Sequence, residues 1–190
     1  MTTATGHHRY TYEEYRFLEE ESSIRHEYLD GEIYAMAGGT PEHAQLAAAI
    51  IGPLNGKLPP GCRTFTSDLR VRIPATGLST YPDAAVVCGR TQRATDDPIA
   101  VLNPVLLVEV TSSSTEDYDR GKKLGHYQKL PSVREVLIVS HRERRLMLHR
   151  REGDTWQTLT AGPGETVALT CLSVSILVDD VYRDAFEEEA

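Results

Sequence analysis

The stretch "PVLLVEVTSSSTEDYDRGKKLGHYQKLPSVREVLIVS", residues 104–140, indicates the fold more strongly than any other part of the chain. Its two ends, "PVLLVEV" and "VREVLIVS", are continuous apolar runs, as in strands that are buried on both faces. The segment between them, 114–130, opens with Ser, Thr and acidic residues and becomes basic later, as a helix dipole favours. A helix that connects two buried strands predicts a right-handed crossover between parallel strands.

Upstream of this unit, two short signals predict local structure. Thr11 is followed three residues later by Glu14, a capping box that predicts a helix over about residues 12–20. The dipeptide Asp30-Gly31 stands between two apolar-rich runs, which is a strong signal for a β-hairpin.

A second helix is predicted from Thr40 as its N-cap and Pro41 at its first position, and Pro53 is expected to bend or end it. Two strands should follow, "CRTFTSDLRVRI" (62–73) and "TYPDAAVVC" (80–88). The remaining predicted segments are a loop over 90–102, a hairpin around Gly153, one or two strands within 166–178, and an acidic, partly helical tail from 179 to 190.

The order of these elements predicts an α/β (α+β) fold, in which helices flank a mixed central sheet and extra hairpins are attached. A chain of 190 residues suffices for one domain with a full core, whereas two domains would be cramped. We therefore expect a single domain over 1–190, with a flexible N-terminus over 1–10, the domain proper over about 10–182 and an acidic tail over 183–190.

The charge balance limits how the chain could bind its partners. The formal net charge is -8 and the pI about 5.4, which argues against broad binding to nucleic acid but leaves room for a local basic groove. The segment "HRERRLMLHRR" (141–151) holds five arginines and one glutamate. A solvated hairpin face is the favoured interpretation of this segment, and contact with a phosphate backbone is the alternative.

The cysteines and the N-terminus point to a soluble, cytoplasmic protein. Cys62, Cys88 and Cys171 are far apart and form no C-x-x-C pair, so neither a disulfide framework nor a structural zinc site is expected. The N-terminal stretch over 1–15 lacks the apolar core of a signal peptide, and no apolar run is long enough to cross a bilayer. No membrane association is expected.

Two carboxylates on different predicted strands form the first candidate site. Asp83 follows "YP", and Glu109 lies within "LLVEVTSSST" (106–115), where apolar residues surround it. Buried carboxylates need a partner, and a shared Mg²⁺ with the Val110 carbonyl as a further ligand would supply one. The alternatives are ordinary turn chemistry for Asp83 and a salt bridge to an arginine for Glu109.

A metal-dependent nuclease would usually place a lysine two residues after the second carboxylate, but Thr111 stands there. Asp119, Lys123 and Tyr127 follow at a spacing of four, which places them on one face of the next helix. A lysine on that face could reach back to Glu109. The alternative is an exposed ion pair between Asp119 and Lys123, worth a few tenths of a kcal/mol.

Four motifs in this order resemble the Uma-type family of restriction endonucleases, a branch of the PD-(D/E)XK nuclease superfamily. The resemblance extends over about residues 10–182 and depends on "RHEYLDGEIYAM" (25–36), "YPDAAVV" (81–87), "LLVEVTSSST" (106–115) and "DRGKKLGHYQKLPSVREVLIVS" (119–140). It implies a restriction-endonuclease-like fold and a lysine that has moved from the strand to the helix. That lysine is Lys123, with Lys122 as the competing candidate, and Glu27 matches an additional acidic metal ligand.

The resemblance also implies a function. Asp83, Glu109, Glu27 and the Val110 carbonyl would hold Mg²⁺, with Mn²⁺ as its substitute, for hydrolysis of phosphodiester bonds in nucleic acid. DNA is the expected substrate, and RNA stays open as the alternative. A homodimer is expected, because nucleases that cut two strands often pair. Weaker candidates for substrate contact are His43, Gln45, Lys122, Tyr127 and Arg120.

Two alternatives from other functional classes stay open at this point. One is a catalytically silent nuclease fold that serves as a binding or scaffold protein. The other is a metal-dependent hydrolase whose substrate is not a nucleic acid, since a fold does not fix a function.

Overall fold

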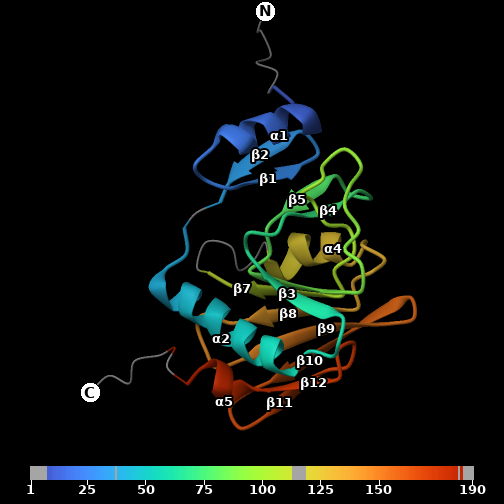
Figure 1. Ribbon diagram of the computed structural model, residues 1–190. Helices are drawn as coiled ribbons and strands as arrows, with labels where there is room; N and C mark the ends of the chain where they lie inside the picture. The colour runs from blue at the N-terminus through green and yellow to red at the C-terminus, as the bar shows by residue number, and fades with distance from the viewer. Residues whose placement is uncertain (1–7, 37, 113–118, 184, 186–190) are drawn as a thin grey trace, which may run out of the picture.

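Two sheets dominate the molecule, which is described by a computed structural model (Figure 1). The structure describes residues 8–36, 38–112, 119–183 and 185, without the side chains of residues 119 and 120. The six-stranded sheet has the order β10 (Thr155–Ala161), β9 (Leu146–Glu152), β8 (Glu135–Val139), β7 (Leu106–Val110), β6 (Ala84–Cys88), β3 (Cys62–Thr66). The four-stranded sheet has the order β2 (Glu32–Ala35), β1 (His26–Leu29), β5 (Leu78–Thr80), β4 (Val71–Ile73).

The N-terminal elements form as their local signals predict. Helix α1 (Tyr12–Glu21) begins with the complete capping box, in which the Glu14 amide donates to Thr11 Oγ1 at 3.2 Å and Glu14 Oε2 accepts from the Thr11 amide at 2.6 Å. Strands β1 and β2 form an antiparallel hairpin. Asp30 and Gly31 have φ of 45° and 93°, the left-handed conformation that a two-residue hairpin turn requires.

Helix α2 (Pro41–Lys57) has Thr40 as its N-cap and Pro41 at its start, as predicted. It continues beyond Pro53 to Lys57, so of the two expectations for this proline, a bend or an end of the helix, the second is wrong. Pro53 removes one backbone hydrogen bond. The fully buried side chains of Ile50 and Leu54, one on each side of it in sequence, pack into the core and keep the helix in place.

The centre of the six-stranded sheet is the predicted parallel pair. Strands β7 and β8 pair in parallel with Glu109 opposite Ile138, and all five residues of each strand are buried. Strand β6 runs antiparallel to β7 on its other side. The mixed central sheet inferred from the sequence is therefore confirmed.

Each face of this sheet is covered by a different layer (Figure 1). Leu106, Val108 and Val110 pack in the core shared with α2, the hairpin β11 (Thr166–Leu169)–β12 (Val174–Leu177) and α5 (Val178–Val181). Leu107 packs in the core on the opposite face, with α4 (Leu124–Tyr127) and strands β4 and β5. Because side chains alternate along a strand, Glu109 shares the α4 face with Leu107.

Two predicted strands are in fact two strands each, which corrects the expectation from the sequence. The segment 62–73 divides into β3 and β4, and the segment 80–88 contains the end of β5 and all of β6. In both cases the parts belong to different sheets. A turn closed by the Leu69 amide on the Thr66 carbonyl (3.0 Å) separates β3 from β4, and Pro82 separates β5 from β6.

The crossover between β7 and β8 is not a plain α-helix in its described part. Residues Asp119–Lys123 form a π-helical turn, which α4 continues. The predicted helix start near Glu116 lies outside the described residues. None of the described helices is long and apolar enough to span a membrane.

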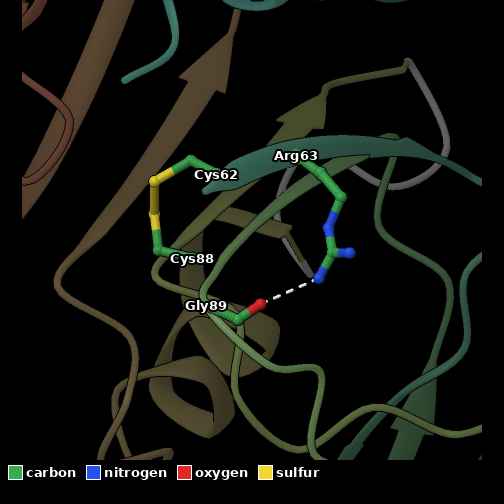
Figure 2. Close-up of a disulfide and its surroundings, with 4 residues drawn as sticks. All are labelled: Cys62, Arg63, Cys88 and Gly89. Carbon is green, nitrogen blue, oxygen red and sulfur yellow. Dashed lines mark hydrogen bonds between the residues drawn. A yellow bond between two sulfur atoms is a disulfide. The ribbon is translucent and has the colours of Figure 1, made fainter. Parts of the chain in front are cut away.

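Cys62 and Cys88 form a disulfide, although the cysteine spacing led us to expect no disulfide framework (Figure 2). They are opposite each other on β3 and β6. The next pair along the ladder shares a hydrogen bond, Gly89 N–H to Gly61 O at 2.8 Å, which makes Cys62–Cys88 a non-hydrogen-bonded pair with close side chains. Arg63 adds a second link across these strands by donating to the Gly89 carbonyl at 2.8 Å (Figure 2).

Candidate active site

Glu109 is a buried carboxylate near the carboxyl end of β7. The residue is 4% exposed, and its side chain lies on the sheet face that α4 covers. Its Oε1 atom accepts a hydrogen bond from the Tyr127 hydroxyl and lies 3.1 Å from the Lys123 ammonium. The apolar run that produces the strand therefore also carries its carboxylate into a place where water is largely excluded.

Lys123 points into the carboxylate cluster and not toward solvent. Its ammonium lies 2.9 Å from Glu27 Oε1 and 3.1 Å from Glu109 Oε1, and the residue is 4% exposed. Lys122, the competing candidate, is exposed. The π-helical turn ends at Lys123, so the helical repeat is wider here than in the α-helix that the spacing of four assumed.

Glu27 reaches the same point from the other sheet. It lies on β1, opposite Tyr34 of β2, and is 8% exposed. Its Oε1 accepts a hydrogen bond from the hydroxyl of Thr80, the last residue of β5, in addition to the Lys123 contact. Because β1 and β5 are paired, the small sheet presents both groups together.

Asp83 lies just before β6, at the carboxyl end of β7. Its Oδ2 accepts from the Val110 amide at 2.7 Å, which places the carboxylate beside the residue that follows Glu109. His43, in the first turn of α2, has its Nε2 3.0 Å from the Val110 carbonyl and 3.4 Å from Asp83 Oδ2. A carbonyl can only accept, so His43 Nε2 carries the proton in this contact.

Two neighbouring side chains have shifted acidities with clear causes. Complete burial raises the pKa of Tyr127 well above its usual value, and the nearby Glu109 carboxylate raises it further. Tyr127 therefore stays protonated and donates a hydrogen bond to Glu109. Burial also lowers the pKa of His126, while the charge of Glu27 opposes this shift.

The donor set fits a hard divalent cation. Glu27 and Glu109 both contact the Lys123 ammonium, a formal excess of one negative charge. Asp83 adds a third carboxylate beside Val110, whose carbonyl oxygen lies 3.0 Å from His43 Nε2. Mg²⁺ prefers such oxygen ligands and needs only one or two carboxylates from the protein. In the described part of the chain, no three His, Cys, Asp or Glu side chains form a ready-made ligand group.

The weaker sequence candidates occupy varied positions. Gln45 is exposed on α2, two residues beyond His43, and the side chain of Arg120 is outside the described residues, as is that of Asp119. Thr80 and His126 were not among the candidates from the sequence. In the sequence, Thr80 is only a hydroxyl residue three positions before Asp83, and His126 is only a histidine next to Tyr127. Without the fold, neither position indicates that the side chain contacts the candidate site.

The fold is that of a solved nuclease-like structure. A crystal structure from Anabaena variabilis ATCC 29413, described as "a putative nuclease belonging to DUF820", superimposes with a TM-score of 0.75. The match covers 92% of this chain and 98% of that one at 18% sequence identity. A mixed α+β, restriction-endonuclease-like fold is thereby established.

The family follows from sequence comparison. Residues 12–178 match the family model Uma2, described as "Putative restriction endonuclease", and the chain belongs to this family. Two uncharacterized proteins of Synechocystis sp. (strain ATCC 27184 / PCC 6803 / Kazusa) are similar to it. For slr1290 the identity is 35% over 173 residues (90% of each chain), and for sll1609 it is 30% over 159 residues (82% of this chain, 89% of the other).

Proposed function

We propose that this protein is a metal-dependent endonuclease that hydrolyses phosphodiester bonds in nucleic acid, with DNA as the preferred substrate. Membership of the Uma2 family and the nuclease-like fold support the general class. The observation that carries the finer proposal is the position of Lys123, buried between Glu27 and Glu109 although it comes 14 residues after Glu109 in sequence.

A divalent cation, Mg²⁺ with Mn²⁺ as its substitute, would be held by Asp83, Glu109 and the Val110 carbonyl, with Glu27 beside them. When bound, it supplies polarisation of the scissile phosphate and a lowered pKa of a bound water. The oxygen donors and their excess negative charge support this assignment.

The residues of this chain then have separate tasks. Lys123 offsets the negative charge that develops on the phosphate oxygens and orients the attacking water. Tyr127 holds one oxygen of Glu109 through a hydrogen bond from its hydroxyl, so the carboxylate has a fixed rotamer. His43 fixes the Val110 carbonyl and lies close enough to Asp83 to hold the end of β7 against β6.

The test is cleavage of duplex DNA, single-stranded DNA and RNA with Mg²⁺ or Mn²⁺, comparing the wild type with Asp83→Asn and Lys123→Met. We expect each substitution to lower the cleavage rate by about a hundredfold or more, since each removes a charge contact to the reacting groups. Lys129→Met is the control, because it deletes an exposed lysine of the same crossover that is not part of the candidate site, and it should cleave as the wild type does.

Metal binding is measured independently of cleavage by titration calorimetry with Mn²⁺. The wild type should bind the ion, and Asp83→Asn should bind it more weakly. A wild type that binds Mn²⁺ but cuts no nucleic acid would refute the nuclease proposal and leave the metal site. Unimpaired cleavage by Asp83→Asn would refute the site itself.

Nucleases that cut both strands of a duplex often pair, so a homodimer belongs to this proposal. Light scattering coupled to gel filtration gives the mass directly, and a dimer is expected at twice 21.1 kDa. A strictly monomeric protein that nicks only one strand would contradict this part while leaving the chemistry intact.

A further inference from the structure

The turn between β8 and β9, residues 141–145, lies at the same edge of the sheet as the candidate active site. We call these residues, His141, Arg142, Glu143, Arg144 and Arg145, the basic turn. Strands β7 and β8 are parallel, so their carboxyl ends meet at one edge. Both the candidate ligand Glu109 and the start of the basic turn are therefore placed there.

Hydrogen bonds join the basic turn to the strand that carries Glu109. The Thr111 amide donates to the Val139 carbonyl at 2.9 Å, and the His141 amide donates to Thr111 Oγ1 at 3.1 Å. His141 Nδ1 also lies 2.8 Å from Thr111 Oγ1. Thr111, which stands two residues after Glu109 where such nucleases usually have a lysine, thus connects the active-site strand to the basic turn.

The basic turn carries a local excess of positive charge on an acidic protein. Arg142, Arg144 and Arg145 are exposed, and Glu143 is paired with Arg145 at 3.1 Å. The chain as a whole has a formal net charge of -8. A polyanionic substrate approaching such a molecule needs local cationic contacts close to the reacting centre.

The backbone of the basic turn is held in place. The Ser140 amide donates to the Arg145 carbonyl at 3.1 Å, which closes the turn. The hydroxyl of the buried Tyr182 lies 2.8 Å from the Ser140 carbonyl and 2.7 Å from the Arg145 carbonyl, at both ends of the turn. Such a preorganised loop loses little conformational entropy when it binds a ligand.

The other arginines of the segment 141–151 serve the fold instead. Arg150 pairs with the buried Glu135 at 2.7 Å. Arg151 donates to three backbone carbonyls and lies over the Trp156 ring, 4.6 Å from its centroid. The five arginines thus divide into a structural pair and an exposed group beside the candidate site, a division that the sequence pattern alone did not show.

We infer that the basic turn binds the sugar–phosphate backbone of the nucleic acid next to the scissile phosphate, an inference that rests on the proposed function. Guanidinium groups suit this task because they bind phosphate oxygens with two parallel hydrogen bonds and stay charged at all relevant pH values. The turn lies at the same edge of the sheet as Glu109, so its arginines hold the bound strand next to the candidate active site.

The test is the affinity for fluorescent DNA duplex, single-stranded DNA and RNA duplex, measured by anisotropy over a range of salt concentrations without divalent cation. The double variant Arg142→Gln/Arg144→Gln is compared with Arg90→Gln/Arg134→Gln. The control arginines are also exposed, but they lie at the edge of the sheet away from the basic turn. Arg90 follows the carboxyl end of β6, and Arg134 directly precedes the amino end of β8. Both pairs remove the same charge, so any difference reports position.

We expect the variant in the basic turn to bind DNA about tenfold or more weakly. The slope of log K against log salt should fall by about one to two, one for each phosphate that an arginine no longer neutralises. The control variant should match the wild type in affinity and slope. Thermal unfolding midpoints equal to that of the wild type in both variants show that the fold is intact. Tighter binding of the RNA duplex than of DNA would assign the surface to RNA.

The outcomes separate this inference from the proposed function. If the wild type cuts DNA and both variants bind and cut equally, the role of the basic turn is refuted and the nuclease assignment stands. If the wild type binds without cutting, and only the variant in the basic turn loses binding, the surface stands and hydrolysis is refuted. A wild type that binds no nucleic acid overturns both.

Discussion

At the scale of the residue, the decisive feature is one ammonium group between two carboxylates from different sheets. Burying a charge costs several kcal/mol unless partners replace water, and here Lys123, Glu27 and Glu109 replace it for one another. Hydroxyls from Thr80 and Tyr127 satisfy the same carboxylate oxygens. The arrangement is stable only as a set, which makes it sensitive to the loss of any member.

Substitution of Lys123 by Met is expected to lower the free energy of unfolding by about 3–5 kcal/mol, because it leaves two buried carboxylates without their cation. Lys122→Met, on the exposed neighbour, should change it by less than about 0.5 kcal/mol. Urea unfolding without divalent cation measures both. Adding Glu27→Gln to Lys123→Met should restore part of the loss, since one uncompensated charge is removed. Equal midpoints for the two lysine variants would contradict the buried cluster.

Tyr127→Phe removes only the hydroxyl that donates a hydrogen bond to Glu109 and leaves the packed ring in place. Because the acceptor is a carboxylate, we expect a loss of about 1.5–3 kcal/mol in urea unfolding. Tyr15→Phe is the matched control: Tyr15 is also fully buried, but its hydroxyl donates to the His26 carbonyl at 2.8 Å, so about 0.5–1.5 kcal/mol is expected. A smaller effect at Tyr127 than at Tyr15 would argue against a charged acceptor.

At the scale of the element, the sequence was sufficient wherever one short signal acts locally. The capping box of α1, the Asp30-Gly31 turn and the apolar runs of β7 and β8 each formed as predicted. It was insufficient where an element depends on distant partners. The alternating pattern of 62–73 continues through the point where the chain changes sheets, and only tertiary pairing shows that change.

The candidate site shows the same limit. Lys123 could be named from its sequence context, but the π-helical turn before it could not, since i to i+5 hydrogen bonding has no clear sequence signal. Thr80 could not be connected to Glu27 before the pairing of β1 with β5 was known. The pairing of Cys62 with Cys88 needed the register of β3 on β6.

That disulfide connects the edge strand β3 to β6, and its reduction should loosen this edge. The two cysteines are 26 residues apart in sequence. Because the disulfide lowers the conformational entropy of the unfolded chain, it is expected to stabilise the fold by about 3–4 kcal/mol. We expect the Cys62→Ser/Cys88→Ser variant to unfold at lower urea concentration than the oxidised wild type and to be insensitive to reductant.

Cys171→Ser is the control for this measurement. Cys171 is a free, half-buried thiol whose pKa burial raises, so it should not react readily, and its loss should leave the reductant effect unchanged. Identical unfolding midpoints for the oxidised and the reduced wild type would show that the ladder of β3 and β6 holds the edge without the disulfide.

At the scale of the whole molecule, the candidate site lies where the two sheets meet. Glu27 and Thr80 come from the four-stranded sheet, and Lys123 comes from the crossover between β7 and β8. Glu109 lies on β7 of the six-stranded sheet, and Asp83 directly precedes β6 of the same sheet. Ionic and hydrogen-bonding contacts within the site therefore also connect the two sheets. A change at the site is expected to alter global unfolding as well as chemistry.

Buried ionisable groups outside the site set the pH range in which the molecule is stable. Burial lowers the pKa of His149, which is 8% exposed on β9, and raises the pKa of several tyrosines, that of Tyr12 to about 12. A lowered histidine pKa means that the unfolded chain binds more protons as the pH falls below about 6.5, so stability decreases there. A raised tyrosine pKa means that the unfolded chain releases protons first above about pH 10, so stability decreases there too.

Urea unfolding measured from about pH 5 to about pH 11 should therefore give a plateau between the two limbs. His149→Gln cannot titrate and should flatten the acid limb, while Tyr12→Phe should flatten part of the alkaline limb and leave the acid limb unchanged. An acid limb of the same steepness in the wild type and in His149→Gln would assign the loss of stability to the carboxylates. Because His149 has its Nδ1 atom 3.0 Å from the Thr158 hydroxyl on the neighbouring strand, glutamine retains a polar partner there, and the comparison isolates the charge.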